Sequence, residues 1–326
     1  MYLINKEKAR SCLSETYQQM FDDIVYQRVL GASTHIKMIG EMIEDICSQA
    51  LSSNVTTKDL IENIEELTNY FIHTRGEASQ AITNAIYVMI QGLHQHVHKG
   101  VSQAVHDIID IKNQYHQKAK AASELAVGYA IEIGNRMERI LVFDYSSSVE
   151  AFLRNIEGEK LIYIAESRII NGGKPFVKAC VERGHKVHFI PDASLMYYMK
   201  DCDGVFMGAE TLLPDGTGYN TTGSDIVGVL CDYYKIPLYF ISPLIKTDIR
   251  PVYGKEKPLV YNDLKEKLQE IADPDNIGVD IDYLTPELVG VAPQFIRAFI
   301  TEEGVIPSGA MYEVCMNYMK DLKGGL

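Results

Sequence analysis

The sequence has no excess of positive charge and no apolar stretch long enough to span a membrane. Lysine and arginine together number 31, against 44 aspartate and glutamate residues, which gives a formal net charge of -13 at pH 7. Such an acidic chain has no broad basic surface, so we do not expect nucleic acid as its main ligand. An anionic ligand would need a local basic pocket. No apolar run approaches the roughly 20 residues of a membrane-spanning helix, so no membrane contact is expected.

Cysteine pairs with the spacing of a redox or metal motif are also missing. The six cysteines lie at positions 12, 47, 180, 202, 231 and 315, and no CxxC occurs among them. They fall on expected helices or beside expected strands, as small apolar residues do. The beginning of the chain, MYLINKEKAR, carries no long apolar segment. These features predict a protein of the reducing cytoplasm.

Strand signals are almost absent from residues 1–130. One amphipathic segment follows another there, as in DLIENIEELTNYFI, where Leu60, Ile64 and Leu67 fall on one helical face. The pattern predicts an all-helical N-terminal domain over residues 1–130. A long helix from about residue 102 to residue 130 is expected to lead into the first strand at Arg139.

Residues 131–326 show a different pattern. Five short apolar runs, RILVF, KLIYIA, KVHFI, GVFMG and IPLYFIS, are separated by amphipathic stretches. Such runs predict buried parallel strands joined by helices. Prolines 243, 251 and 258 then predict a loop excursion, and the tail from Pro286 to Met319 is expected to return to helix. The predicted fold class is therefore α/β, an all-helical domain followed by a mostly parallel sheet domain.

A polar side chain follows each predicted strand. The residues at these strand ends are Asp144, Glu166, Asp192, Glu210 and Ser242. In parallel α/β sheets, ligands bind outside the carboxyl ends of the strands. The sequence therefore predicts that any site lies at this edge of the sheet.

The segment GAETLLPDGTGYNTTGSDIVGVLCDYY carries the most specific pattern of the chain. A hairpin-like loop is expected from Pro214 to Gly218, and NTTGS is expected to open a helix. Polar residues at a helix N-terminus, where backbone N–H groups are unpaired, favour an anion. The same residue types also serve as ordinary helix caps. Both interpretations stay open at this point.

Several motifs resemble those of one protein family. GAETLLPDGTGYNTTGSD is similar to the GAD…NG…NKIGT stretch of methylthioribose-1-phosphate and ribose-1,5-bisphosphate isomerases, and to its GAE version in the alpha, beta and delta regulatory subunits of translation initiation factor 2B. HTRGEASQAITNAI resembles the Arg-containing helix start of that family, ILVFDYSSSV its ILTHCNT strand end, and ESRIINGGKP its ETRPxxQG loop. IDYLTPELV and EEGVIPSGA are similar to its C-terminal signature. The pieces occur in order over about residues 70–315.

This resemblance implies a Rossmann-like domain over residues 131–326 that binds the ligand and dimerises. It also implies a substrate or phosphate site, whose residues would be Arg75, Glu166, Arg168, Gly173, Asn220, Thr221, Thr222, Gly223 and Ser224. The expected ligand is a sugar phosphate or a nucleotide. The expected assembly is a homodimer or a higher homo-oligomer.

The sequence departs from the isomerase pattern at five positions. Asp144 and Glu210 stand where the resembled isomerases have a catalytic Cys and Asp, so the resemblance implies catalytic roles for this altered pair. Leu30, Gly172 and Thr221 stand where the family has Arg, Gln and Lys. Two functions stay open: an aldose–ketose isomerase of a phosphorylated pentose, or a non-catalytic metabolite-sensing or assembly subunit of the initiation factor 2B type.

Three other site types are not expected. Asp144 at a strand end also suits the aspartyl nucleophile of haloacid-dehalogenase-type phosphatases, but Ser146 occupies the position of their second acid. GTGYNTTG has the wrong glycine spacing for a dinucleotide fingerprint. His94 and His98 could share a helix face, yet two histidines without a third ligand favour a solvated helix end. No metal and no cofactor are therefore expected.

Overall fold

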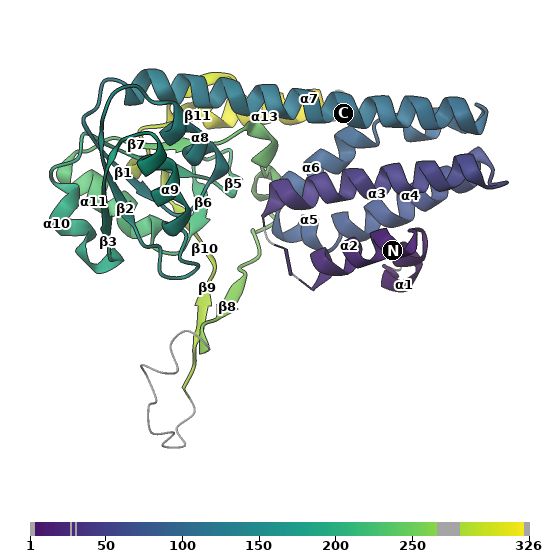
Figure 1. Ribbon diagram of the computed structural model, residues 1–326, viewed down its shortest axis with the longest axis horizontal. Helices are drawn as coiled ribbons and strands as arrows, with labels where there is room; N and C mark the ends of the chain where they lie inside the picture. Colours follow the sequence, from purple (N-terminus) through teal and green to yellow (C-terminus); the bar gives the residue numbers. More distant parts are fainter. Residues whose placement is uncertain (1–3, 27, 30, 266–280, 323–326) are drawn as a thin grey trace. The chain divides into compact units, whose positions relative to one another are not determined.

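The computed structural model describes residues 4–26, 28–29, 31–265 and 281–322. The chain divides into two compact units (Figure 1). The helical unit comprises residues 1–121, 245–247 and 317–326, and the sheet unit comprises residues 122–244 and 248–316. Among the described residues before Arg139 every regular element is helical, which confirms the helical part of the predicted fold.

The helices of the first part of the chain are α1 (Lys6–Ser11), α2 (Glu15–Val25), α3 (Ala32–Ser52), α4 (Thr57–Ile72), α5 (Arg75–Ala78), α6 (Gln80–Met89), the 3-10 turn η1 (Leu93–His96) and α7 (Val101–Gly134). No described helix combines the length and the apolar character that crossing a membrane requires.

Helix α4 shows how the sequence sets these elements. Its start is a capping box, in which Asp59 N donates to Thr56 Oγ1 at 3.2 Å and Thr56 N donates to Asp59 Oδ2 at 2.9 Å. Leu60, Ile64 and Leu67 are fully buried on one face, as predicted. The helix therefore forms because its cap is satisfied locally and its apolar face enters the core of the unit.

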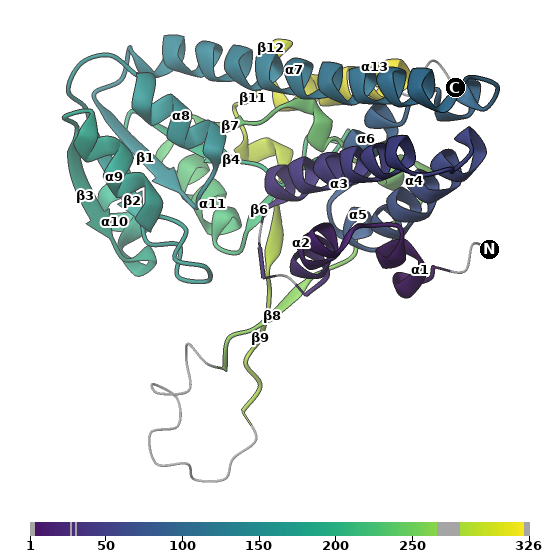
Figure 2. The same cartoon turned by 45° about the vertical axis from the view of Figure 1, so that its right-hand side comes forward.

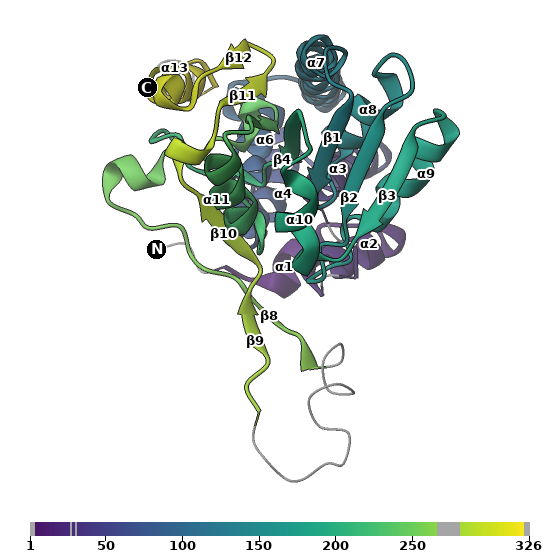
Figure 3. The same cartoon turned by 90° about the vertical axis from the view of Figure 1, so that its left-hand side faces the viewer.

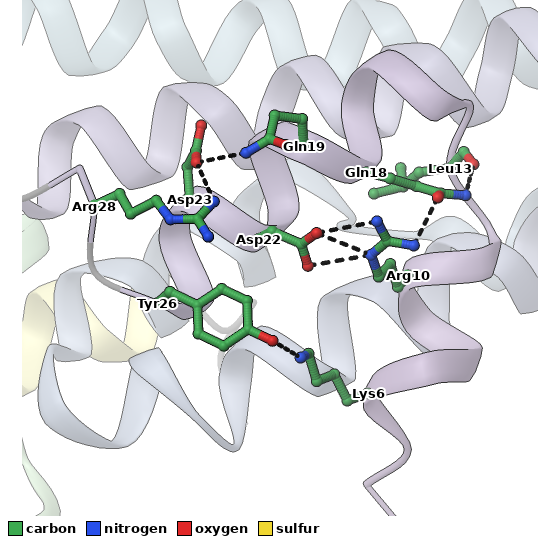
Figure 4. Close-up of polar contacts among 9 residues, drawn as sticks. All are labelled: Lys6, Arg10, Leu13, Gln18, Gln19, Asp22, Asp23, Tyr26 and Arg28. Atoms are coloured by element: carbon green, nitrogen blue, oxygen red, sulfur yellow. Dashed lines mark hydrogen bonds and ion pairs between the residues drawn. The ribbon is translucent and has the colours of Figure 1, made fainter.

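Polar contacts join α1 to α2 (Figure 4). Arg10 donates to Asp22 through Nε at 3.1 Å and Nη2 at 3.0 Å, and Nη1 donates to Gln18 Oε1 at 2.7 Å. Partly exposed ion pairs of this kind contribute about 1 kcal/mol or less. Phe21 and Ile24, which are fully buried on α2, contribute the larger share of the stabilisation, while the polar contacts fix the orientation of the helix.

The main sheet has seven strands in the order β12-β11-β7-β4-β1-β2-β3. The strands are β1 (Arg139–Phe143), β2 (Leu161–Ala165), β3 (Lys186–Ile190), β4 (Gly204–Gly208), β7 (Leu238–Ile241), β11 (Ala298–Thr301) and β12 (Gly304–Ile306). All pairings are parallel except that of β11 with β12. The five predicted runs correspond to β1, β2, β3, β4 and β7, which confirms the mostly parallel sheet.

Helices cover both faces of this sheet. α8 (Ser147–Asn155) and α9 (Lys174–Glu182) lie on one face, and α10 (Leu195–Met199) and α11 (Ser224–Tyr234) lie on the other (Figure 3). The chain moves from β1 towards β3, then returns to β4 on the other side of β1. Strand order thus reverses between β1 and β4, and ligands of α/β sheets bind at such a switch point.

The core of the sheet unit lies between β1 and its covering helices. Ile140 and Val142 of β1 are fully buried, and so are Phe152 of α8 and Phe206 of β4. The rings of Phe152 and Phe206 are 4.5 Å apart between centroids. This packing fixes the carboxyl ends of β1 and β4, which carry the candidate site.

Smaller elements complete the sheet unit. β5 (Thr211–Leu212), β6 (Gly218–Thr221) and β10 (Leu288–Val291) form a three-stranded sheet, and β8 (Tyr261–Asp263) pairs with β9 (Leu284–Pro286), as Figure 2 shows. The remaining turns and helix are η2 (Asp192–Ser194), η3 (Leu244–Lys246), η4 (Arg250–Tyr253), η5 (Pro293–Phe295), η6 (Ser308–Ala310) and α13 (Met311–Leu322). The expected hairpin after Glu210 is present as β5 and β6.

The prediction that the tail from Pro286 to Met319 is helical was wrong for most of its length. β10, β11 and β12 occupy its first part, and helix begins only at Met311. β11 is buried at all four positions because it adds to the parallel edge at β7. Burial in a sheet therefore decides the conformation of these short apolar runs. Gly290 and Pro293 also interrupt any helical periodicity in this part of the tail.

Candidate functional site

Asp144 is the first residue after β1, and its backbone is unusual. Its φ is 61°, in the left-handed region that non-glycine residues rarely adopt. Ser167 and Asn171, in the loop after β2, also have positive φ values of 47° and 55°. Backbone strain of this kind costs energy and is concentrated at functional sites. Three of the four described non-glycine residues with positive φ thus lie in the loops after β1 and β2.

The carboxyl group of Asp144 is buried and fully engaged. It accepts a hydrogen bond from Ser167 Oγ at 2.9 Å and another from Thr221 Oγ1 at 2.7 Å, while the residue is only 3% exposed. Burial raises the pKa of Asp144 above its ordinary value, although the two hydroxyl donors oppose that rise. The nearby Asp192 carboxylate adds a smaller upward effect on the same pKa.

Three of the departures from the isomerase pattern meet at this carboxyl group. Thr221 donates to Asp144, as described above. A Cβ atom added at Gly172 would lie 2.0 Å from Asp144 Oδ1, so any side chain there would collide with it. Asp144, Gly172 and Thr221 therefore form one packed and hydrogen-bonded unit. Leu30, the fourth departure, lies outside the described residues.

The loop after β2 is held by Asp192, which follows β3. Its carboxylate accepts hydrogen bonds from Ser167 N at 2.9 Å and Arg168 N at 2.8 Å. The Arg168 guanidinium is half-exposed and lies 3.7 Å from Glu166, which is longer than a hydrogen bond. The Arg168 side chain is therefore held only loosely, at a backbone position that is fixed.

Gly173 has a steric role at the start of α9. A Cβ atom there would lie 1.9 Å from the carbonyl oxygen of Ala165, the last residue of β2. The loop therefore approaches the end of β2 more closely than any residue other than glycine at position 173 would allow. The motif glycine at this position is required for that approach.

The ends of β1 and β4 also approach each other. A Cβ atom at Gly208, the last residue of β4, would lie 2.4 Å from Ser146 Cβ. Glu210 follows two residues later, and its N–H donates to the Tyr219 carbonyl of β6 at 2.8 Å. Asp144 and Glu210 thus follow neighbouring strand ends at the switch point, and their action on one ligand remains a prediction.

The segment Asn220–Ser224 differs from the expected helix start. Asn220 and Thr221 belong to β6 rather than to the first turn of α11. Asn220 Nδ2 donates to Ser224 Oγ at 3.1 Å, and Thr222 Oγ1 donates to the Pro286 carbonyl. The assignment of Asn220 and Thr221 to a helix start was therefore wrong, because pairing with β10 extends the strand to Thr221.

The first turn of α11 has no side-chain cap. Its N-cap is Gly223, with a φ of 104°, and no side chain there accepts a hydrogen bond from the turn. A Cβ atom at Gly223 would lie 2.7 Å from the Phe143 ring, so glycine suits both the backbone and the space. The capping interpretation is therefore not supported, since the nearby polar side chains bond elsewhere.

Arg75 belongs to the helical unit, as the first residue of α5. Its Nε is buried and has no hydrogen-bond partner within the part of the chain that the structure describes. A buried guanidinium nitrogen without a partner is costly, which makes Arg75 suitable for an anionic ligand. Its pairing with Arg168 on one phosphate stays a prediction.

No histidine-rich metal site is found among the described residues, where no group of three or more His, Cys, Asp or Glu side chains could hold an ion. His94 Nε2 lies 2.8 Å from Glu65, and His96 Nδ1 lies 3.5 Å from Asp107. His98 lies beyond the end of η1. His94 and His98 therefore do not share a helix face, the alternative that the sequence analysis had not favoured.

Sequence reasoning missed Ser167, which contacts Asp144, and Lys257, which contacts the residue that accepts from Glu210 N. Ser167 was hidden between the motif residues Glu166 and Arg168, and nothing in its sequence context indicates that it donates to Asp144. Lys257 lies in a segment without any motif, 5.5 Å from the Tyr219 ring centroid. Only its position in a Pro-flanked loop near the end of the apolar runs could have drawn attention to it.

Comparison with known proteins identifies the family. The model of the initiation factor 2 subunit family matches residues 32–308. Ribose 1,5-bisphosphate isomerase of Pyrococcus furiosus is 22% identical over 305 residues, covering 91% of this chain and 92% of that protein. Matches to proteins named as methylthioribose-1-phosphate isomerases span less than half of either chain.

Solved structures share the fold. A crystal structure of 5-methylthioribose 1-phosphate isomerase from Pyrococcus horikoshii OT3 superposes with a TM-score of 0.75 at 18% identity, covering 96% of this chain and 87% of that one. A tetrameric complex of eIF2B beta and delta subunits from C. thermophilum gives 0.67 at 13% identity, with 98% and 100% covered. The family match spans most of the sequence, and the chain belongs to the initiation factor 2 subunit family.

Proposed function

We propose that this chain binds a sugar phosphate at the carboxyl edge of the main sheet. The observation that carries this proposal is the uncapped first turn of α11. Asn220 donates to Ser224 and Thr222 donates to the Pro286 carbonyl, and no side chain caps the turn. The N–H groups of a first helical turn have no partner within the helix and favour a negative charge. The Arg168 side chain, which is loosely held in the loop after β2, would supply a charge-assisted contact to the phosphate.

The electrostatics of Asp144 are compatible with a phosphate close by. A carboxylate next to an anion would repel it, but burial raises the pKa of Asp144 and so favours its neutral form. Thr221, which adjoins the start of α11, donates to this same carboxyl group. The raised pKa of Asp144 thus lowers the electrostatic cost of an anion close by.

Isomerase chemistry is the second candidate function. An aldose–ketose isomerisation moves a proton between neighbouring carbon atoms, and it needs one group to transfer the proton and another to stabilise the charge that develops. Asp144, with its raised pKa, has the character of such an acid, and Glu210 would be its partner. Against catalysis stands the engagement of Asp144 by Ser167 and Thr221, which occupies its oxygens. We therefore rank ligand binding first.

We further propose a homodimer in the cytoplasm, formed through residues 131–326. The tetrameric eIF2B beta and delta complex named above supports an oligomeric assembly by fold likeness. No disulfide joins any of the six cysteines, all of which lie in described parts of the chain, and this suits a reducing compartment. Light scattering at micromolar concentration would test the dimer, and a monomer would count against it.

Isothermal titration at one fixed salt concentration tests the binding function. The panel would contain ribose 1-phosphate, ribose 1,5-bisphosphate, methylthioribose 1-phosphate and nucleoside monophosphates. Arg168→Ala should lose about 1.5 to 3 kcal/mol of affinity, the range for hydrogen bonds to charged groups. Arg183→Ala, an exposed arginine in the turn after α9, serves as the matched control. Absence of binding by wild type at millimolar ligand would refute the proposal.

A turnover assay on the same panel separates the two candidates. If the chain is an isomerase, Asp144→Asn and Glu210→Gln should abolish turnover while binding is mostly kept, because these groups would act in the transition state. Binding without turnover by wild type would leave the sensing or assembly function.

A further inference from the structure

Lys257 lies among charged groups beside the β5–β6 hairpin. Its Nζ is 5.5 Å from the ring centroid of Tyr219, within the range of a cation–π contact. The Tyr219 carbonyl accepts the hydrogen bond from Glu210 N at 2.8 Å, so Tyr219 contacts both the Lys257 ammonium and Glu210. Lys257 itself is only partly exposed.

Four charged or titratable groups act on the ammonium group of Lys257. Glu210, Asp248 and Arg250 contribute to its pKa through charge interactions, and the Tyr219 ring is the aromatic neighbour. Burial lowers the pKa of Lys257 below its ordinary value, while the carboxylates of Glu210 and Asp248 oppose that fall, with Glu210 giving the larger opposing effect. Asp215 lies beyond Tyr219 and acts on the tyrosine.

Asp248 is already engaged by Arg250. It accepts Arg250 Nε at 2.9 Å, Nη2 at 2.8 Å and the backbone N–H at 3.0 Å. Asp248 N in turn donates to the Leu212 carbonyl of β5 at 2.9 Å, which holds this pair against the hairpin. A bidentate arginine largely neutralises a carboxylate. Glu210 is therefore the main carboxylate that interacts with the Lys257 ammonium.

We infer that Lys257 is a positioning residue that acts through Glu210. The Lys257 ammonium, which lies over the ring of Tyr219, pairs with the Glu210 carboxylate and orients it at the end of β4. This inference deepens the proposed function and rests on it for the ligand. An oriented, ionised carboxylate accepts hydrogen bonds from hydroxyl groups and repels phosphate oxygens. Glu210 held by Lys257 would accordingly bind the sugar hydroxyls of the ligand, and not its phosphate.

The pair itself is tested by the reactivity of Lys257, without any ligand. Competitive labelling with acetic anhydride over a pH series, read by mass spectrometry of the peptide, gives the pH at which the amine becomes reactive. In Glu210→Gln this midpoint should move down by about 0.5 to 1 pH unit, because the group that favours the ammonium is lost. The matched control is Glu256→Gln, an exposed acid next to Lys257 that should leave the midpoint unchanged. An unmoved midpoint in Glu210→Gln would overturn the pair.

Binding of ribose 1-phosphate and of inorganic phosphate tests the positioning role. Lys257→Met should lower the affinity for ribose 1-phosphate about 10-fold and leave the affinity for inorganic phosphate within about 2-fold of wild type, because only the contact with the sugar hydroxyl is lost. In a Glu210→Gln background, Lys257→Met should add less than about 2-fold, since the two residues act as one unit. Lys257→Arg should restore most of the affinity. Lys255→Met, from the same exposed segment, is the control.

The outcomes separate this inference from the proposed function. If Lys257→Met loses affinity for ribose 1-phosphate and for inorganic phosphate equally, the effect is a general structural one, and the positioning role is overturned. Additive losses in the double variant would overturn it as well. If wild type binds neither probe at millimolar concentration, the proposed function fails, and the labelling midpoint alone then supports or overturns the Lys257–Glu210 pair.

Discussion

Gly172→Ala should destabilise the sheet unit, although alanine adds a single methyl group. The added Cβ would lie 2.0 Å from Asp144 Oδ1 and 2.9 Å from Tyr145 N, far inside normal contact. Asp144 cannot easily yield, because Ser167 and Thr221 hold both of its oxygens in a buried place. Overpacking of this kind costs about 1 to 3 kcal/mol. The φ of Gly172 is not positive, so backbone strain adds nothing to this expectation.

Urea unfolding followed by circular dichroism at 222 nm measures the loss in the free energy of unfolding. Hydrogen exchange in the β1 and β2 peptides shows that the loss occurs in the sheet unit. The control is Gly309→Ala, where a Cβ atom would meet nothing within 4 Å. The double variant with Asp144→Ala should lose less than the sum of the two single losses, since the clash with the carboxyl group is gone. A Gly172→Ala variant as stable as wild type would refute the packed unit of Asp144, Gly172 and Thr221.

Two further predictions concern the sheet unit. Because burial raises the pKa of Asp144 above 3.8, wild type loses stability as the pH rises through the folded-state pKa. The free energy of unfolding of Asp144→Asn, relative to that of wild type, should therefore increase from pH 4 to pH 7, by about 1.4 kcal/mol for each unit of the pKa shift. Urea titrations in which this difference does not depend on pH would contradict the prediction. Phe152→Ala should cost about 3 to 5 kcal/mol, because Phe152 is fully buried 4.5 Å from the Phe206 ring, and a loss below 1 kcal/mol in the same assay would contradict that packing.

The main elements of the fold could be predicted from periodicity. The apolar face of α4 and the five buried runs follow from local sequence, because burial on one helical face or in a covered sheet requires those patterns. The short strands β10, β11 and β12 could not be predicted this way. Runs of three or four residues such as AFIT become strands through pairing with partners distant in sequence, here β7 in the case of β11.

The candidate site shows the same division. Strand-end position drew attention to Asp144 and Glu210, the family resemblance implied their catalytic roles, and the motifs identified Arg168 and Gly173. The hydrogen bonds of Asp144 to Ser167 and Thr221 join residues 23 and 77 positions apart, so no local pattern indicates them. Helix capping by Asn220 and Thr221 was a reasonable local interpretation, but pairing of β6 with β10 places both residues in a strand.

A crystal structure of the chain with ribose 1,5-bisphosphate tests the central claim most directly. The account predicts one phosphate at the first turn of α11, within hydrogen-bond distance of the backbone N–H of Ser224 or its neighbours, and the Arg168 guanidinium turned towards that phosphate. It also predicts a sugar hydroxyl donating to the Glu210 carboxylate. Sugar phosphate bound with both phosphates away from α11 and Arg168 would contradict the account.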